Sequence, residues 1–341
     1  PKTPNTGLSF DDKLFEYTLN ATKEFENGFD KNPVVPFDNV IKAIEVFDEP
    51  MPVNETEALD VMKMLHEIGS PATTLSRGGR FFGFVVGGTL PVAQASNWLT
   101  TAWDQNAALT VLGYTASKLE QVSRKWIVEM LNLPSDAAMG IVSGATMAGF
   151  TALSSARHRI YKKQGYDLKK SGLKNAPDIK IIVNADIHAT NITALGYMGY
   201  GRDEIIFSPV DDQGRIIVEQ IPELDENTII ILQAGNINSG AFDDFKTICA
   251  MAKEKGAWVH VDGAFGGWLK VSPTRGYLAD GMEFADSWSI DCHKWLNVPY
   301  DSAIAICRDR NAIREAFTIT ASYLTSDGER IPNNYTPELS R

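Results

Sequence analysis

Lys294 carries the clearest chemical potential in this chain, because it lies among apolar and aromatic residues beside His293 and Trp295. Loss of water and nearby cations lower the pKa of a lysine and make its amine nucleophilic. A neutral lysine amine is the group that forms Schiff bases with carbonyl compounds. The segment alone also allows a lysine whose stem covers apolar surface while its ammonium reaches water. Other segments must decide between these interpretations.

Asp262 ends a run of residues typical of a β-strand and is followed by glycines. Alternation with a period of two places Trp258, His260 and Asp262 on one face of that strand. In an α/β sheet, the carboxyl end of a buried strand faces the crevice where ligands bind. A carboxylate there could hold the proton on the ring nitrogen of pyridoxal phosphate, whose ring works as an electron sink. The alternative is that Asp262 caps the following helix.

A turn of small residues between a strand and a helix could bind the phosphate of such a cofactor. The turn consists of Ser143, Gly144, Ala145 and Thr146. Small residues let backbone N–H groups approach a phosphate closely, and a helix N-terminus adds the positive end of its dipole. Thr146 can add a hydroxyl. The same residues also form an ordinary helix N-cap, and they match neither the P-loop nor the dinucleotide fingerprint.

His188 follows an apolar run at residues 181–183 that predicts a strand, and it stands at the opening of a helix. A histidine in that position can face a pocket rather than a core. A single histidine is more often structural than catalytic. In combination with the other three segments, His188 becomes a candidate to stack on a cofactor ring and to donate a proton.

The order of these four segments resembles that of the group II pyridoxal-phosphate-dependent amino acid decarboxylases, which include aromatic amino acid, glutamate and diaminobutyrate decarboxylases. The shared pattern is a small-residue loop, then His-x-Thr, Val-Asp-x-Ala and Asp-x-His-Lys-Trp. The likeness covers most of the chain, from Arg80 to Arg341. It implies an α/β protein similar to the fold-type I transferases that use pyridoxal phosphate, with a mostly parallel sheet and helices on both faces.

The resemblance assigns a role to each candidate residue. Lys294 is similar to the lysine that forms a Schiff base with the cofactor, Asp262 to the partner of the ring nitrogen and His188 to the stacking histidine. These three are the catalytic candidates. The remaining cofactor-binding candidates match positions that lie under the ring, bind the phosphate or flank the lysine: Ala264, Ala145, Thr146, Asp291 and His293.

Two positions depart from the family pattern. Thr193 stands where the family often has a lysine, and Ile237 stands where it often has a threonine hydroxyl near the cofactor. The resemblance therefore leaves the substrate open. It also implies a loop over residues 323–335 that closes on the substrate, in which Tyr335 is either the donor of the final proton or an ordinary surface tyrosine.

Composition agrees with a cofactor enzyme and excludes several other classes. The chain has 341 residues, 44% of them hydrophobic, which is enough for a large core. Its net charge of −11 argues against nucleic acids and anionic membranes as partners. The three cysteines and five histidines lack metal-site spacing, so we expect no metal and a reducing, cytoplasmic compartment. No signal peptide or membrane-length apolar run is visible.

The chain divides into an N-terminal arm at residues 1–75 and a large domain that binds pyridoxal phosphate at residues 76–341. In the large domain, alternating strand and helix patterns predict a mostly parallel sheet. The strands are expected at residues 140–142, 181–183, 228–233 and 258–261, and helices at 146–163 and 244–255. The resemblance implies a C-terminal small domain after Glu338 to Arg341, which these 341 residues do not contain.

The sequence predicts decarboxylation of an L-amino acid through a Schiff base at Lys294. A carbon–carbon lyase or an aminotransferase with the same cofactor is one alternative, and a non-catalytic binding protein that keeps the fold is another. The family implies a homodimer whose subunits share the site. Apolar residues from Trp98 to Trp103 predict part of the interface, because they are too hydrophobic for a free surface.

Overall fold

The computed structural model describes residues 11–318 and 331–339. The chain divides into two compact units, Pro1–Val86 and Gly87–Arg341. The first unit is helical. Its α-helices are α1 (Asp12–Asn27), α2 (Asp38–Ala43) and α3 (Ala58–Met64). Helix α1 begins where the Asp11 side chain accepts a hydrogen bond from the Leu14 N–H, and it packs against α3.

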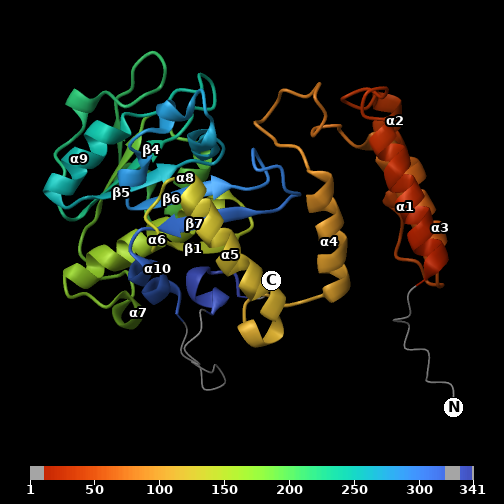
Figure 1. The fold of residues 1–341 in the computed structure, drawn as a ribbon, viewed down its shortest axis with the longest axis horizontal. Coiled ribbons are helices and arrows are strands. Elements are labelled where there is room, and N and C mark those ends of the chain that lie inside the picture. Colours follow the sequence, from red (N-terminus) through yellow and green to blue (C-terminus); the bar gives the residue numbers. More distant parts are fainter. Residues whose placement is uncertain (1–10, 319–330, 340–341) are drawn as a thin grey trace. The chain divides into compact units, whose positions relative to one another are not determined.

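The second unit contains a seven-stranded sheet with the order β1-β7-β6-β5-β4-β2-β3 (Figure 1). The strands are β1 (Ala138–Val142), β2 (Lys180–Asn184), β3 (Ile205–Ser208), β4 (Thr228–Gln233), β5 (Trp258–Asp262), β6 (Ser287–Asp291) and β7 (Ala303–Cys307). Strand β7 pairs antiparallel with both β1 and β6, whereas the other pairs are parallel. The carboxyl ends of all strands except β7 therefore lie at one edge, which we call the carboxyl edge; the opposite one is the amino edge.

Helices cover both faces of this sheet (Figure 1). The helices of the second unit are α4 (Pro91–Trp103), α5 (Tyr114–Met130), α6 (Ala145–Lys163), α7 (Leu168–Ser171), α8 (Ala189–Tyr197), α9 (Phe245–Lys255) and α10 (Arg310–Phe317). One core cluster joins α5 and α9 to one face, and a second joins α6, α8 and α10 to the other. The predicted α/β class with a mostly parallel sheet is confirmed.

Strand β4 illustrates why the sequence forms this sheet. It is buried along its whole length, and its side chains alternate between the two core clusters. Ile229 and Ile231 pack in one cluster, and Ile230 and Leu232 pack in the other. β-Branched residues in a short, continuous apolar run are typical of a parallel strand buried on both faces. The strand predicted at residues 228–233 has the observed bounds.

Helix α9 shows equally clear end signals. Its N-cap residue Asp244 accepts a hydrogen bond from the Thr247 N–H at 3.1 Å. It ends at Gly256, whose φ of +73° lies in the left-handed region that favours glycine. Within the described residues, no helix is both long enough and apolar enough to cross a membrane.

Candidate active site

Strands β5 and β6 end in carboxylates that lie at the carboxyl edge of the sheet. Asp262 is the last residue of β5, and Asp291 is the last residue of β6. After β5, the chain turns so that the Ala264 N–H donates to Asp262 Oδ1 at 3.0 Å. The Asp291 N–H then donates to the Ala264 carbonyl oxygen at 2.9 Å. Hydrogen bonds from backbone N–H groups thus connect three of the predicted site residues directly.

Lys294 lies beside Asp291, with 3.1 Å between Lys294 Nζ and Asp291 Oδ2. The other oxygen, Asp291 Oδ1, is 3.4 Å from His293 Nε2. Burial raises the pKa of Asp291, but the contact with His293 and the positive charge of Lys294 together outweigh burial and hold the pKa below its ordinary value. The carboxylate is therefore ionised at neutral pH and can interact with the lysine ammonium.

The orientation of the His293 ring is set by two contacts. The Ser302 N–H donates to His293 Nδ1 at 3.0 Å, so a neutral ring carries its hydrogen on Nε2, which faces Asp291. The ring also stacks on Tyr300, with 4.1 Å between centroids and 23° between planes. The backbone of Asp291 is held separately, because Trp268 Nε1 donates to its carbonyl oxygen at 2.7 Å.

The N-terminus of α6 lies next to this segment. Helix α6 begins at Ala145, and its N-cap residue Gly144 makes no side-chain capping bond. The first N–H groups of a helix have no partner within the helix, so an uncapped start can receive an anion. A Cβ atom added to Gly144 would lie 3.8 Å from His293 Cε1, which places the turn beside the lysine segment. Ala145 and Thr146 therefore fit a bound phosphate.

His188 is the N-cap residue of α8, which follows β2 at the same edge of the sheet. Its Nδ1 lies 2.8 Å from Thr190 Oγ1 and accepts a hydrogen bond from the Thr190 N–H at 3.3 Å. One turn later, Asn191 Nδ2 donates to Asp262 Oδ2 at 2.5 Å. The first turn of α8 is thus tied to the carboxylate of β5, and all of the predicted site residues belong to segments at the carboxyl edge.

Three contacts in the site were not expected from the sequence. They are the bond from Asn191 to Asp262, the stacking of Tyr300 on His293, and a bond from the Ser143 N–H to Glu338 Oε2 at 3.0 Å. Asn191 could have been noticed as a polar residue at helical spacing from the apolar Ala194 and Leu195. The other two contacts join residues through loops and leave no periodic signal.

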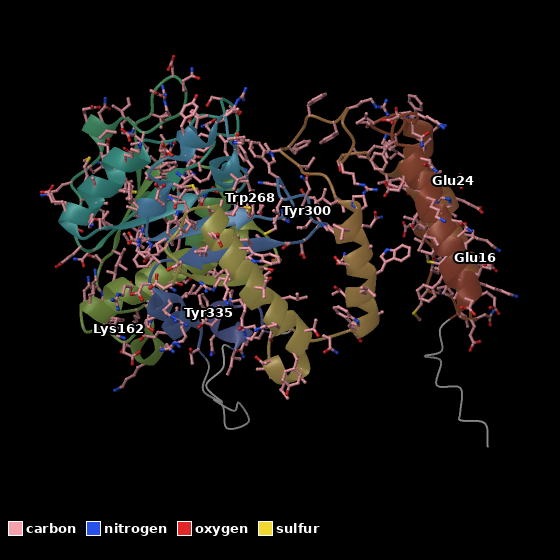
Figure 2. The ribbon with its side chains drawn as sticks, in the orientation of Figure 1. Glu16, Glu24, Lys162, Trp268, Tyr300 and Tyr335 are labelled. Atoms are coloured by element: carbon pink, nitrogen blue, oxygen red, sulfur yellow. The ribbon has the colours of Figure 1, made fainter. Side chains whose placement is uncertain are left out.

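Tyr335 is buried, unlike the surface tyrosine that was one of its two alternatives. The side chain is 4% exposed and packs with Ala138, Cys307 and Ile313, so the interpretation as a surface tyrosine is wrong. Tyr335 also lies apart from Trp268 and Tyr300 (Figure 2), and its cluster includes the first residue of β1, at the amino edge. This position does not support a role as proton donor. Residues 323–330 of the predicted loop lie outside the described part of the chain.

A lysine beside a strand-end carboxylate, a second buried strand-end carboxylate and a helix N-terminus without a side-chain cap lie together on a three-layer α/β fold, as in the fold-type I proteins that bind pyridoxal phosphate. A model of the pyridoxal-dependent decarboxylase conserved domain matches residues 42–336. The chain belongs to the pyridoxal-dependent decarboxylase family. The predicted family and its cofactor, pyridoxal phosphate, are confirmed.

Relatives with established activities share part of their length with this chain. It is 25% identical to an aromatic-L-amino-acid decarboxylase of Bacillus atrophaeus over 285 residues, covering 81% of this chain and 57% of that protein. It is 29% identical to an L-2,4-diaminobutyrate decarboxylase of Rhizobium meliloti, covering 63% of this chain and 41% of that protein. The chain thus spans less than two thirds of the length of these relatives.

Solved structures agree with the fold. A TDC of Oryza sativa, solved with PLP and tryptamine, superposes with a TM-score of 0.86 at 19% identity, covering 100% of this chain and 73% of that one. A tryptophan decarboxylase of Catharanthus roseus, in complex with L-tryptophan, gives a TM-score of 0.79 at 20% identity, covering 98% of this chain and 73% of that one. At such low identity, the likeness establishes the fold alone.

Proposed function

We propose that this protein decarboxylates an L-amino acid with pyridoxal phosphate held as a Schiff base at Lys294. The observation that carries the proposal is the convergence of Lys294, Asp262 and the start of α6 at one edge of the sheet. Pyridoxal phosphate supplies an electron sink that stabilises negative charge on the substrate α-carbon. The protein supplies the groups that bind it, orient it and move protons.

The Lys294–Asp291 pair prepares the amine for its reaction. An ammonium cannot attack an aldehyde, so Lys294 Nζ must first lose a proton. Asp291 Oδ2, at 3.1 Å, holds the Lys294 ammonium in place before that proton is lost. His293 Nε2 contacts the other oxygen of the same carboxylate and helps to fix its orientation. Asp291 and His293 thus position the lysine.

The remaining candidates would bind the other parts of the cofactor. Ala145 and Thr146 would bind the phosphate through backbone N–H groups at the start of α6, and Thr146 could add its hydroxyl. Asp262 would hold the proton on the ring nitrogen. Ala264 and His188 would contact the ring, and His188 would also donate a proton.

Borohydride reduction of the purified protein, followed by peptide mapping, tests the position of the Schiff base. We expect the visible absorbance of the cofactor imine to disappear and a pyridoxyl label to be found on Lys294. A label on a different lysine would overturn the site, and the absence of any label would favour a non-catalytic protein that keeps the fold.

Product analysis tests the reaction. Release of CO₂ and an amine from an L-amino acid supports decarboxylation. Formation of a keto acid would point to an aminotransferase, and cleavage of a side-chain carbon–carbon bond would point to a lyase. The named relatives act on aromatic amino acids and on L-2,4-diaminobutyrate, so a panel of aromatic, acidic and basic amino acids is the appropriate starting set.

We further propose that the protein assembles as a homodimer through α4 and α5. Trp98, Leu99 and Trp103 on α4 are each about half exposed, and Trp126 on α5 is 68% exposed. Apolar surfaces of this kind are typical of protein interfaces. Sedimentation of the cofactor-loaded protein at micromolar concentration tests the assembly, and a monomer that still turns over substrate would exclude a shared site.

A further inference from the structure

Asn191 is a buried polar residue that the proposed mechanism has not yet used. It lies in the first turn of α8 and is 3% exposed. Its Nδ2 donates to Asp262 Oδ2 at 2.5 Å, which joins residues 71 positions apart in the sequence. Burying an amide is unfavourable unless it is hydrogen-bonded, and this bond meets that requirement.

The packing around Asn191 leaves room for an amide between α6 and β5. A Cβ atom added to Gly149 of α6 would lie 3.7 Å from Asn191 Oδ1 and 3.9 Å from the Cβ of Ala194. Small residues thus allow α8 to approach α6 closely at this point. An apolar side chain of similar volume would fill the same space, so packing alone does not require asparagine. The bond to Asp262 does.

Both oxygens of Asp262 receive an N–H donor. The Ala264 backbone donates to Oδ1 at 3.0 Å, and the Asn191 side chain donates to Oδ2. An ionised carboxylate has about four lone-pair sites. Capacity therefore remains for a third donor, such as a protonated ring nitrogen. Two donors on different oxygens fix the plane of the carboxylate and set the direction from which that third donor must come.

We infer that Asn191 is a positioning residue, which holds the Asp262 carboxylate in the orientation that binds the protonated ring nitrogen of the cofactor. The inference rests on the proposed function. Without the Asn191 amide, only the Ala264 backbone restrains the carboxylate, which can then rotate about its Cβ–Cγ bond. The ring nitrogen would keep its proton less well, and the cofactor would bind more weakly.

The test compares Asn191→Leu, which removes the donor but keeps the number and branching of the side-chain heavy atoms, with Leu195→Ala on the same helix. Leu195 is fully buried in the core and makes a control for simple loss of packing. Two quantities are measured in the purified protein: the Kd for pyridoxal phosphate, and the midpoint of the pH-dependent absorbance change of the bound cofactor. Neither measurement depends on turnover.

For Asn191→Leu we expect the Kd to rise about tenfold, as for loss of a hydrogen bond to a charged group, and the spectral midpoint to shift. Leu195→Ala should lower the Tm and leave both quantities near those of the wild type. Asn191→Ser also removes the amide and serves if the leucine variant does not fold. A wild-type Kd and midpoint in the folded Asn191 variant would overturn the inference.

The outcomes separate this inference from the function on which it rests. If the wild-type protein takes no borohydride label at Lys294, the proposed function fails and the role of Asn191 fails with it. If the wild type is labelled at Lys294 but the Asn191 variant matches it in Kd and midpoint, only the positioning role is overturned.

Discussion

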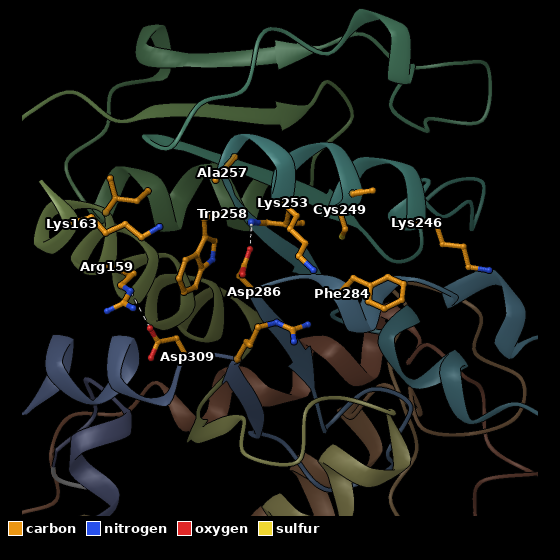
Figure 3. A pocket seen from close by; sticks show the side chains of 15 residues that line it. Arg159, Lys163, Lys246, Cys249, Lys253, Ala257, Trp258, Phe284, Asp286 and Asp309 are labelled. Carbon is orange, nitrogen blue, oxygen red and sulfur yellow. Dashed lines mark hydrogen bonds and ion pairs between the residues drawn. The ribbon is translucent and has the colours of Figure 1, made fainter.

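The two edges of the central sheet both carry charged side chains, but those side chains are used differently. At the carboxyl edge, the charged groups contact one another: Lys294 contacts Asp291, which also contacts His293. At the amino edge, a cavity of about 690 Å³ is lined by several cations (Figure 3). They are Arg159, Lys163, Lys246, Lys253 and Arg308.

The acidic residues of the amino-edge cavity mainly join elements of the fold. Asp286 Oδ2 accepts a hydrogen bond from the Val259 N–H at 2.9 Å, which ties the start of β5 to the segment before β6. Asp309 pairs with Arg159 at 3.1 Å, which ties α6 to the cap of α10. A cluster of cations around a cavity is thus no sufficient sign of catalysis. What distinguishes the carboxyl edge is a lysine held by a buried carboxylate beside the strand-end Asp262 and the start of α6.

Removing one lysine from each edge should give the largest contrast. Lys294→Ala removes the amine that binds the cofactor, so we expect kcat/KM to fall by roughly 10³-fold or more. Lys253→Ala removes an exposed cation from the amino-edge cavity and should leave turnover unchanged. Assays of CO₂ release, with the Tm as a check on folding, decide the matter. Equal losses in both variants would contradict the distinction between the edges.

A matched pair of carboxylates sharpens the same comparison. Asp262→Asn keeps the size of the side chain but removes the charge that holds the ring proton, so we expect the cofactor still to bind, with a Kd raised at least about tenfold, while turnover falls by about 10²-fold or more. Asp286→Asn keeps an acceptor for the Val259 N–H, so turnover should stay within about threefold of the wild type. Near-normal turnover in Asp262→Asn would mean that a group other than Asp262 holds the proton on the ring nitrogen.

His260, in the middle of β5 between the two edges, should control the acid stability of the sheet. Burial lowers the pKa of His260 from 6.5 to about 3. The folded state binds a proton at His260 less readily than the unfolded state does. The contribution of neutral His260 to the free energy of unfolding is therefore fully present above pH 6.5 and is lost as the pH falls toward 3. By linkage the full loss is on the order of 5 kcal/mol.

His260→Gln keeps an amide that can bond to Ser287 or Ser289, the present partners of the ring at 2.9 and 3.2 Å. Unfolding by urea at a series of pH values measures the effect. The variant should show a smaller decrease in the free energy of unfolding between pH 6.5 and pH 4. An unchanged slope would mean that other groups dominate the acid transition.

Loss of the Tyr300 ring should have the smallest effect. Tyr300 stacks on His293 but is 61% exposed, so the interaction is worth about 0.5 kcal/mol, at the low end for aromatic pairs. We expect Tyr300→Leu to raise the Kd for pyridoxal phosphate by about twofold. A loss above tenfold would show that Tyr300 does more than support the His293 ring.

Local patterns in the sequence predicted the elements that carry the site. The apolar run of β4 and the cap signals of α9 were sufficient for these two elements, because both depend on neighbours in the sequence. Conversely, the bond from Asn191 to Asp262 joins two strand–helix units, and no periodic pattern encodes it. The burial of Tyr335 was also missed. Its neighbours in the sequence are polar, and nothing in that pattern indicates that its backbone contacts Gly140 of β1.

The single antiparallel strand also affects the order in which the site forms during folding. Strands β6 and β7 form a hairpin that encloses the Lys294 segment, closed by bonds from the Cys292 and His293 N–H groups to the Ser302 carbonyl. Pairing of β7 with β1, in contrast, joins Cys307 to Ala138. Contacts between residues close in sequence cost less loop entropy and form sooner. In pulsed hydrogen exchange during refolding, the β6–β7 amides should therefore gain protection before those of β1.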